Sequence, residues 1–106
     1  MKYKFNKDKY ITKGIQIEIP LELQIFLWNR IEEMIASKVE LDYLQIFNIN
    51  KSENMISITH SQEEPIPFER EYNIFDEEVV ETIKGSVKLY VIDNIDHSIM
   101  LLASEY

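Results

Sequence analysis

The chain has 106 residues, of which 45% are hydrophobic, and is predicted to form one globular domain over residues 1–106. It contains no cysteine, which excludes disulfides and thiolate chemistry and is typical of a reducing, cytoplasmic compartment. The formal net charge of −8 argues against nucleic acid as a partner, because binding phosphates requires basic residues.

A basic N-terminal arm, at about residues 1–9, begins the chain, and in it Lys2 and Lys4 alternate with Tyr3 and Phe5. The first 13 residues carry five lysines and one aspartate, whereas the rest carries six basic and eighteen acidic residues. We therefore expect the arm to lie on the acidic body, with contact to single-stranded nucleic acid as the alternative. The arm lacks the apolar stretch of a signal peptide, and charges interrupt the apolar region that follows, so no membrane partner is predicted.

Residues 11–19 are predicted to form a half-buried strand. The isoleucines of this segment all share one parity: Ile11, Ile15, Ile17 and Ile19. Such an alternation of β-branched and polar residues is typical of a strand with one face on the core. The segment ends before Pro20, which favours extended backbone in the residue that precedes it.

The clearest element is a long amphipathic helix at about residues 20–37, which begins at Pro20 and contains the single tryptophan, Trp28. Its apolar residues fall in one arc that is wider than half the circumference: Leu21, Leu23, Ile25, Leu27, Trp28, Ile31, Met34 and Ile35. An arc of this width predicts a helix laid across a sheet, or one that a second molecule partly buries.

One residue breaks this pattern, because Phe26 lies on the polar side of the predicted helix. Its helical neighbours include Glu22, Arg30 and Glu33. Since core packing does not explain an aromatic residue there, we predict an interaction surface made of Phe26, Arg30, Glu22 and Glu33.

Strands are predicted over residues 41–50, 55–60, 68–75, 86–93 and 98–104. The first two form a hairpin, and residues 61–67 form a loop because Pro65 and Pro67 cannot donate to a sheet. A short helix is indicated over residues 76–84, with Asp76 as its N-cap and Gly85 past its end. The predicted fold class is α+β, with a mostly antiparallel sheet of five or six strands and the long helix packed on one face.

Few residues suggest catalysis. With two glycines in the whole chain, no glycine-rich phosphate loop is possible, and His60 shares a strand face with isoleucines, as a core residue would. Asp93, Asp96 and His97 form a turn that could hold a divalent metal, with His60 as a further ligand, although such turns commonly bond their own backbone instead. We assign no catalytic residue, no metal ligand and no cofactor, and predict that the protein is not an enzyme.

Several blocks resemble a known family: Tyr10–Ile15, Glu18–Trp28, Leu41–Phe47, Val91–Asp93 and His97–Tyr106. These blocks are similar to the family catalogued as domain of unknown function 960, which occurs in Gram-positive bacteria and their phages. The resemblance spans roughly residues 10–106, and Asp76–Lys84 departs from the family's pattern. It implies a small cytoplasmic α+β protein, but it carries no activity or site residues, because none is established for the family.

The function predicted from the sequence is that of a small acidic protein-interaction or regulatory module without catalytic activity. Its partner would be another protein or a second copy of the chain, as in a homodimer. One alternative is a small metal-dependent enzyme that uses Asp93, Asp96 and His97. The other is an acidic regulator of a basic nucleic-acid-binding protein, which requires a continuous acidic patch.

Overall fold

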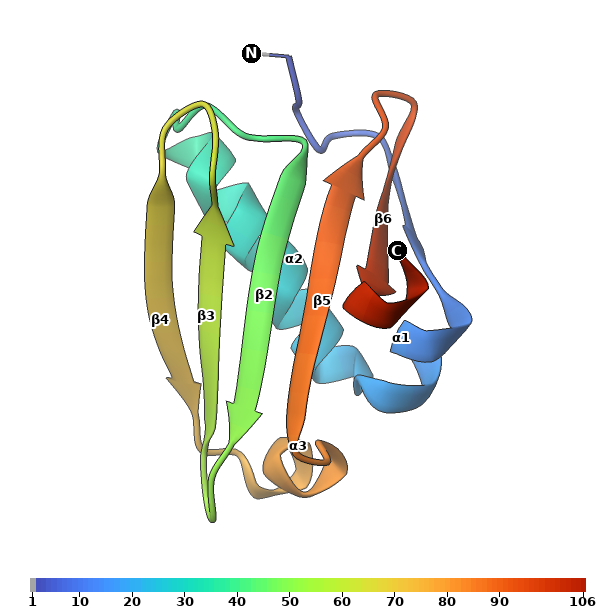
Figure 1. Cartoon of the computed structure of the whole chain (residues 1–106), viewed down its shortest axis with the longest axis vertical. Coiled ribbons are helices and arrows are strands. Elements are labelled where there is room, and N and C mark those ends of the chain that lie inside the picture. Colours follow the sequence, from blue (N-terminus) through green and yellow to red (C-terminus); the bar gives the residue numbers. More distant parts are fainter. Residues whose placement is uncertain (1) are drawn as a thin grey trace.

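The computed structural model describes residues 2–106 and contains a six-stranded sheet with helices at its side and ends (Figure 1). In chain order the elements are β1 (Asp8–Ile11), α1 (Lys13–Glu18), α2 (Leu21–Ala36), β2 (Leu44–Lys51), β3 (Ile56–Gln62), β4 (Phe68–Ile74), α3 (Glu77–Thr82), β5 (Ser86–Asp93), β6 (His97–Leu102) and a 3-10 helix (Ala103–Glu105).

The strands lie in the order β1-β6-β5-β2-β3-β4. The short strand β1 pairs with β6 in parallel, and all the other neighbours are antiparallel. The predicted α+β class with a mostly antiparallel sheet is therefore confirmed, and the predicted hairpin is the pair β2–β3. Strand β2 lies inside the sheet, between β5 and β3, so its backbone is paired on both sides.

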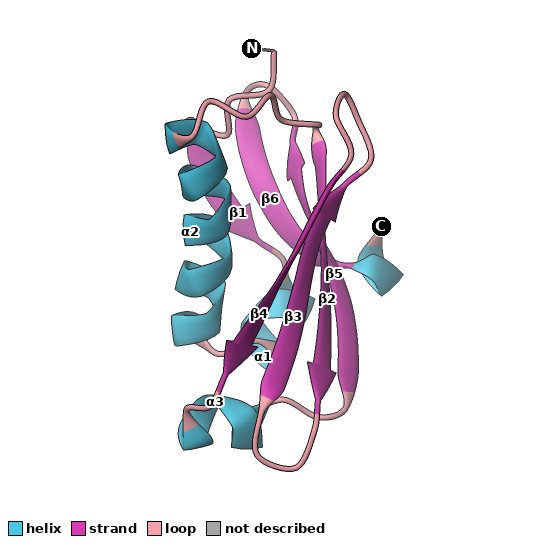
Figure 2. Ribbon diagram, turned by 90° about the vertical axis from the view of Figure 1, so that its left-hand side faces the viewer, coloured by secondary structure: helices cyan, strands magenta, loops and turns pink. Residues whose placement is uncertain are grey.

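Helix α2 lies against one face of the sheet, and Figure 2 shows the opposite face free of any long element. It has 16 residues, where the sequence predicted about residues 20–37, and Pro20 occupies its N-cap position. Its buried apolar residues follow each other at three or four positions, as the helical repeat requires: Leu23, Leu27, Ile31 and Met34. Within residues 2–106 no helix is both long and apolar enough to cross a membrane.

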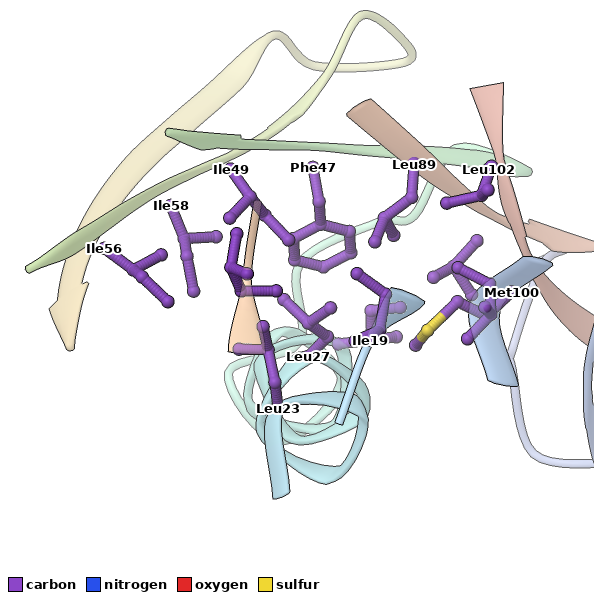
Figure 3. Close-up of a cluster of buried hydrophobic side chains, with 14 of the residues drawn as sticks. Ile19, Leu23, Leu27, Phe47, Ile49, Ile56, Ile58, Leu89, Met100 and Leu102 are labelled. Carbon is purple, nitrogen blue, oxygen red and sulfur yellow. The ribbon is translucent and has the colours of Figure 1, made fainter. Parts of the chain in front are cut away.

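The core fills the layer between α2 and the sheet (Figure 3). Leu23 and Leu27 point from the helix towards Phe47, which lies at the centre of β2. All three side chains are at most 1% exposed. Burying a side chain of this size stabilises the folded chain by roughly 1.5–3 kcal/mol, so this layer is the main source of stability.

The predicted strand over residues 11–19 is wrong, because the chain leaves β1 at Ile11 and turns into helix α1. The Thr12 hydroxyl caps that helix by accepting a hydrogen bond from the backbone N–H of Ile15 at 3.3 Å. Ile15 and Ile19 are buried whereas Ile17 is 70% exposed. The buried pair is four residues apart, one helical turn, so the isoleucines that suggested a period of two also fit a helix.

The basic arm lies against the body of the protein. Phe5 is fully buried, and its backbone N–H donates a hydrogen bond to the Asp93 carboxylate at 3.0 Å. The short helix predicted over residues 76–84 is present as α3, where the Asp76 carboxylate accepts a hydrogen bond from the backbone N–H of Val79 at 3.2 Å. Gly85 follows it with a φ of +77°, a conformation that glycine adopts at little cost.

The C-terminal segment is hydrogen-bonded to the start of α1. Sequence alternation predicted a strand to residue 104, but β6 ends at Leu102 and the 3-10 helix follows. The Glu105 carboxylate accepts hydrogen bonds from the Thr12 hydroxyl at 2.6 Å and from the backbone N–H of Gly14 at 3.2 Å. The bond from Thr12 holds the pKa of the Glu105 carboxyl below its usual range. Gly14 allows this approach, since a Cβ atom there would lie 2.7 Å from Leu102 and 2.8 Å from Glu105.

We predict that Gly14→Ala lowers the free energy of unfolding by about 1 kcal/mol, because the added methyl group displaces the ends of the Leu102 and Glu105 side chains and weakens the hydrogen bonds of Glu105. Urea unfolding followed by circular dichroism measures the change. Gln16→Ala, at an exposed position of the same helix, should change stability by less than about 0.5 kcal/mol. Equal stability of Gly14→Ala and the wild type would show that the contact between α1 and the C-terminus is not tight.

Candidate functional site

The surface predicted around Phe26 rested on a premise that the structure contradicts. Phe26 is half-buried and packs against the core, with its ring 5.7 Å from that of Tyr72 on β4 in an edge-on contact. The Arg30 guanidinium lies 4.2 Å from the centre of the Phe26 ring and forms an ion pair with Glu33 at 3.0 Å. Core packing therefore does explain Phe26, because β4 lies beneath that side of the helix. Whether Phe26, Arg30, Glu22 and Glu33 bind a partner stays a prediction.

Part of the wide apolar arc of α2 does remain in solvent. Leu21 is 64% exposed and Ile25 is 51% exposed, one helical turn apart. Trp28 is half-buried, with the Lys9 ammonium 5.8 Å from its ring. The exposed part of the arc is thus a short stripe of two aliphatic side chains.

The three residues of the predicted metal turn do not converge. Both oxygens of the Asp93 carboxylate accept backbone hydrogen bonds, from Phe5 at 3.0 Å and from Ile95 at 2.7 Å. Asp93 pairs with Ser98 across the sheet, so His97, one residue before Ser98, points to the opposite face. Across the described residues, no three histidine or carboxylate side chains form a group that could hold a metal ion. The Asp93 side chain instead fastens the N-terminal arm to the sheet.

His60 lies inside the core rather than at a surface. It is fully buried, its ring stacks on Phe47 at 4.3 Å, and its Nε2 atom lies 2.8 Å from Oε1 of Gln45. Burial, helped by the positive charges of Arg30 and Arg70, lowers the pKa of His60 to about 4. The imidazole is therefore neutral at pH 7 and serves the core packing.

The hydrogen bonds of His60 continue to the end of the sheet. Gln45 donates from Nε2 to Oε1 of Gln62 at 2.8 Å. Gln62 in turn accepts from the backbone N–H of Asp42 at 2.9 Å and donates to the carbonyl groups of Glu40 and Ile66 at 3.0 Å each. This buried chain of amides fixes the segment before β2 beside the loop after β3.

A cavity of about 570 Å³ opens between these two segments. We call it the tyrosine groove, and it is lined by Lys2, Tyr3, Glu40, Leu41, Asp42, Tyr43, Leu44, Glu63, Glu64 and Pro65. Half of these side chains are aromatic or aliphatic, and four are carboxylates. Neither ion pair that the described residues form, Lys9–Glu32 and Arg30–Glu33, uses a carboxylate of the groove. The groove thus combines apolar walls with four carboxylates and a single lysine, Lys2, so its net charge is negative.

Tyrosine rings connect this groove to the uncovered side of the sheet. The rings of Tyr3 and Tyr43 lie 5.9 Å apart, and the rings of Tyr90 and Tyr106 lie 5.3 Å apart. The neighbouring Tyr106 hydroxyl raises the pKa of the Tyr43 hydroxyl, so the two pairs lie close to each other. Four of the six tyrosines therefore form one continuous surface.

The uncovered side of the sheet carries an apolar patch, which we call the open sheet face. It consists of Tyr10, Leu44, Ile46, Tyr90, Ile92, Ile99 and Leu101. The strand register places these side chains next to one another, and each alternates with a residue that points to the α2 side. Leu101 is buried, Tyr10 is exposed and the other five are half-buried. Towards β3 and β4 the same side becomes polar, with Ser57, Thr59, Ser61, Glu69 and Glu71.

The sequence contained a partial signal for this patch. The alternation in residues 41–50 places apolar side chains on both sides of β2, a pattern that is typical of a strand covered on both faces. The structure covers only one of them with a helix (Figure 2). The groove had no sequence signal, because it forms where three segments distant in the chain meet.

Comparisons with other proteins support the fold. The family described as "Staphylococcal protein of unknown function (DUF960)" matches residues 8–105, which confirms the resemblance seen in the sequence. No curated protein matches the chain. The chain is also similar to a protein of unknown function from Enterococcus faecalis, whose crystal structure gives a TM-score of 0.81 at 18% identity. The match covers 100% of this chain and 98% of the other. At this identity the likeness concerns the fold alone.

We predict that buried His60 makes stability fall in mild acid. In the unfolded chain this side chain binds a proton near pH 6.5, but in the folded chain only near pH 4. Between these values the unfolded state binds more protons, so the free energy of unfolding decreases as the pH falls from 6.5 to 4, by roughly 3 kcal/mol in all.

Urea unfolding at a series of pH values tests this dependence. His60→Gln should remove this part of the slope, whereas His97→Gln, which changes the half-buried histidine of β6, should keep it. If both variants show the same slope as the wild type, His60 is not neutral and buried in solution.

Proposed function

The chain belongs to the family described as staphylococcal protein of unknown function (DUF960), and we propose that it is a non-catalytic module that binds another protein through the open sheet face. The observation that carries this proposal is the continuity of the apolar patch. Seven side chains from four neighbouring strands lie in register on the side of the sheet opposite α2, which carries the short C-terminal 3-10 helix but no long helix among the described residues (Figure 2). Tyr10 is exposed and five of the others are half-buried, and contiguous apolar surface that stays in contact with solvent is typical of protein-binding sites.

The composition of this surface supports protein binding. Tyr10 and Tyr90 belong to the open sheet face, and Tyr106 packs against the ring of Tyr90. Tyrosine is enriched in interfaces because its ring gives a large apolar contact while the hydroxyl tolerates water. The aliphatic residues between the rings are half-buried already, so covering them with a partner removes apolar area from water at little cost in side-chain order.

The charge of the chain favours a basic partner. Residues 14–106 carry six basic and eighteen acidic residues, a net charge of −12. Complementary charge increases the rate of encounter and disfavours wrong partners. We therefore propose a partner with an apolar contact surface flanked by lysine or arginine side chains. A basic nucleic-acid-binding protein is one class that has this chemistry.

A second copy of the chain fits this surface less well. Two copies joined through their open sheet faces would also bring together the glutamates of β4 and of the groove, and like charges at an interface are unfavourable. Self-association is therefore an outcome that the experiment below distinguishes from binding to another protein.

Three features support a non-catalytic role over the metal-dependent enzyme. His60 lies in the core, out of reach of a substrate. Asp93 uses both carboxylate oxygens to bind the backbone of Phe5 and Ile95. His97 lies on the other side of the sheet from Asp93. The residues with the chemistry of a metal site thus have structural contacts of their own.

We predict that Ile99→Lys abolishes partner binding, because it places a charge in the middle of the apolar patch and repels a basic partner. The matched control is Ile25→Lys, which makes the same substitution at an exposed site on α2. Tagged wild type and both variants are used to capture proteins from native lysate, with mass spectrometry as the readout, and light scattering gives the oligomeric state of each.

We expect all three proteins to be monomers. Wild type and Ile25→Lys should capture a basic protein that Ile99→Lys does not capture. A wild-type dimer that Ile99→Lys converts to a monomer would replace the basic partner with a second copy. Retention of the same proteins by all three, or loss with Ile25→Lys alone, would rule out the open sheet face.

A further inference from the structure

We infer that the tyrosine groove is a binding site for a lysine or arginine side chain in a basic peptide segment. This inference rests on the proposed function for its biological partner, because Leu44 lines the groove and also belongs to the open sheet face. The ligand would be a cation on a flexible aliphatic stem, presented by an extended chain. Its test uses a defined peptide and does not depend on that partner.

The walls of the groove suit the stem and the cation of such a side chain. The rings of Tyr3 and Tyr43 lie 5.9 Å apart at an angle of 53°, so a cation beside this pair can lie near both rings. Cations bind aromatic faces within about 6 Å of the ring centre. Leu41 and Pro65 add apolar wall for the methylene groups. A volume of about 570 Å³ leaves room for the peptide residues on either side.

The acidic side chains supply the opposite charge. Glu40 and Asp42 precede β2, and Glu63 and Glu64 follow β3, so the four carboxylates approach the groove from two segments. Asp42 also accepts a hydrogen bond from the backbone N–H of Glu64 at 3.2 Å, which links the two segments. No arginine lines the groove, and Lys2 is its one cation among the described residues.

Lys2 shows what kind of group the groove accepts. Its ammonium lies 5.2 Å from the centre of the Tyr3 ring, so a cation of the chain itself already occupies one wall. A peptide lysine must share this wall or displace Lys2. The N-terminal arm therefore acts as a competitor for the site, and removing its cation should strengthen peptide binding.

The groove is held in shape before any ligand binds. Gln62 is 3% exposed and bonds to the backbone of Asp42, Glu40 and Ile66, which fixes both walls. A site that needs no reordering loses less free energy on binding. Gln62 is therefore a positioning residue for the groove.

The experiment measures binding of a fluorescent peptide of alternating lysine and serine by anisotropy at an ionic strength of about 0.1 M. The same peptide with acetylated lysines has equal length but no positive side chains. Glu40→Gln/Glu63→Gln removes two carboxylates from the groove. Its matched control, Glu77→Gln/Glu78→Gln, removes two from α3 at the opposite end of the molecule (Figure 1).

We expect the acetylated peptide not to bind, the groove double variant to weaken binding about tenfold or more, and the α3 double variant to weaken it less than about twofold, since exposed charges beyond about 10 Å are screened. Lys2→Ala should tighten binding more than Lys84→Ala, which removes an equal charge near α3. Circular dichroism confirms that each variant is folded.

Equal weakening by the two double variants would mean that the peptide responds to net charge alone and would overturn the inference, as would absence of binding to the wild type. These results are independent of Ile99→Lys. Peptide binding in the groove together with unchanged partner capture by Ile99→Lys contradicts the proposed function only. If Ile99→Lys loses its partner and the wild type binds no peptide, only the inference about the groove is contradicted.

Discussion

The packing of α2 on a single face of the sheet is the constraint on which the rest of the structure depends. Leu23 and Leu27 meet Phe47 in one apolar layer, and residues 2–106 form no second helix of comparable length to cover the other side (Figures 2 and 3). A sheet that has a helix on one face only must be polar on its free face or bind something there. The free face meets this requirement with serine, threonine and glutamate over β3 and β4 and with Asn48 and Lys88 on β2 and β5, but not at the seven residues of the open sheet face.

A second, polar constraint shapes the end of the sheet. His60, Gln45 and Gln62 form a buried chain of hydrogen bonds within a core whose side chains are mostly apolar. Such groups are costly to bury without partners, so each amide is directed at a defined backbone atom. The result is a rigid mouth around the tyrosine groove. The same residues thus stabilise the fold and shape the groove. The pH dependence of the free energy of unfolding therefore reports on the geometry of the groove.

Elements whose residues are close in sequence could be predicted. The hairpin β2–β3 follows from alternation, and α3 follows from Asp76 and Gly85 at its two ends. Helix α1 was missed because Ile15 and Ile19 fit a strand and a helix equally well. Phe26 was misjudged because a helical projection cannot show that β4 lies beneath it. The groove could not be predicted at all, since it forms only when Tyr3, Tyr43 and Pro65 are brought together by the fold. Family membership supports the architecture and leaves the function to be argued from these surfaces.

The central claim is that the open sheet face and the adjoining groove form one binding surface. The most direct measurement is nuclear magnetic resonance of the isotope-labelled chain during titration with a peptide of alternating lysine and leucine, which can contact both parts. We predict chemical-shift changes that converge on the side chains of Tyr3, Tyr43, Tyr90 and Ile99, with little change at Leu21 and Ile25 of α2. Changes that centre on Leu21 and Ile25, or that spread evenly over all acidic surfaces, would contradict the account.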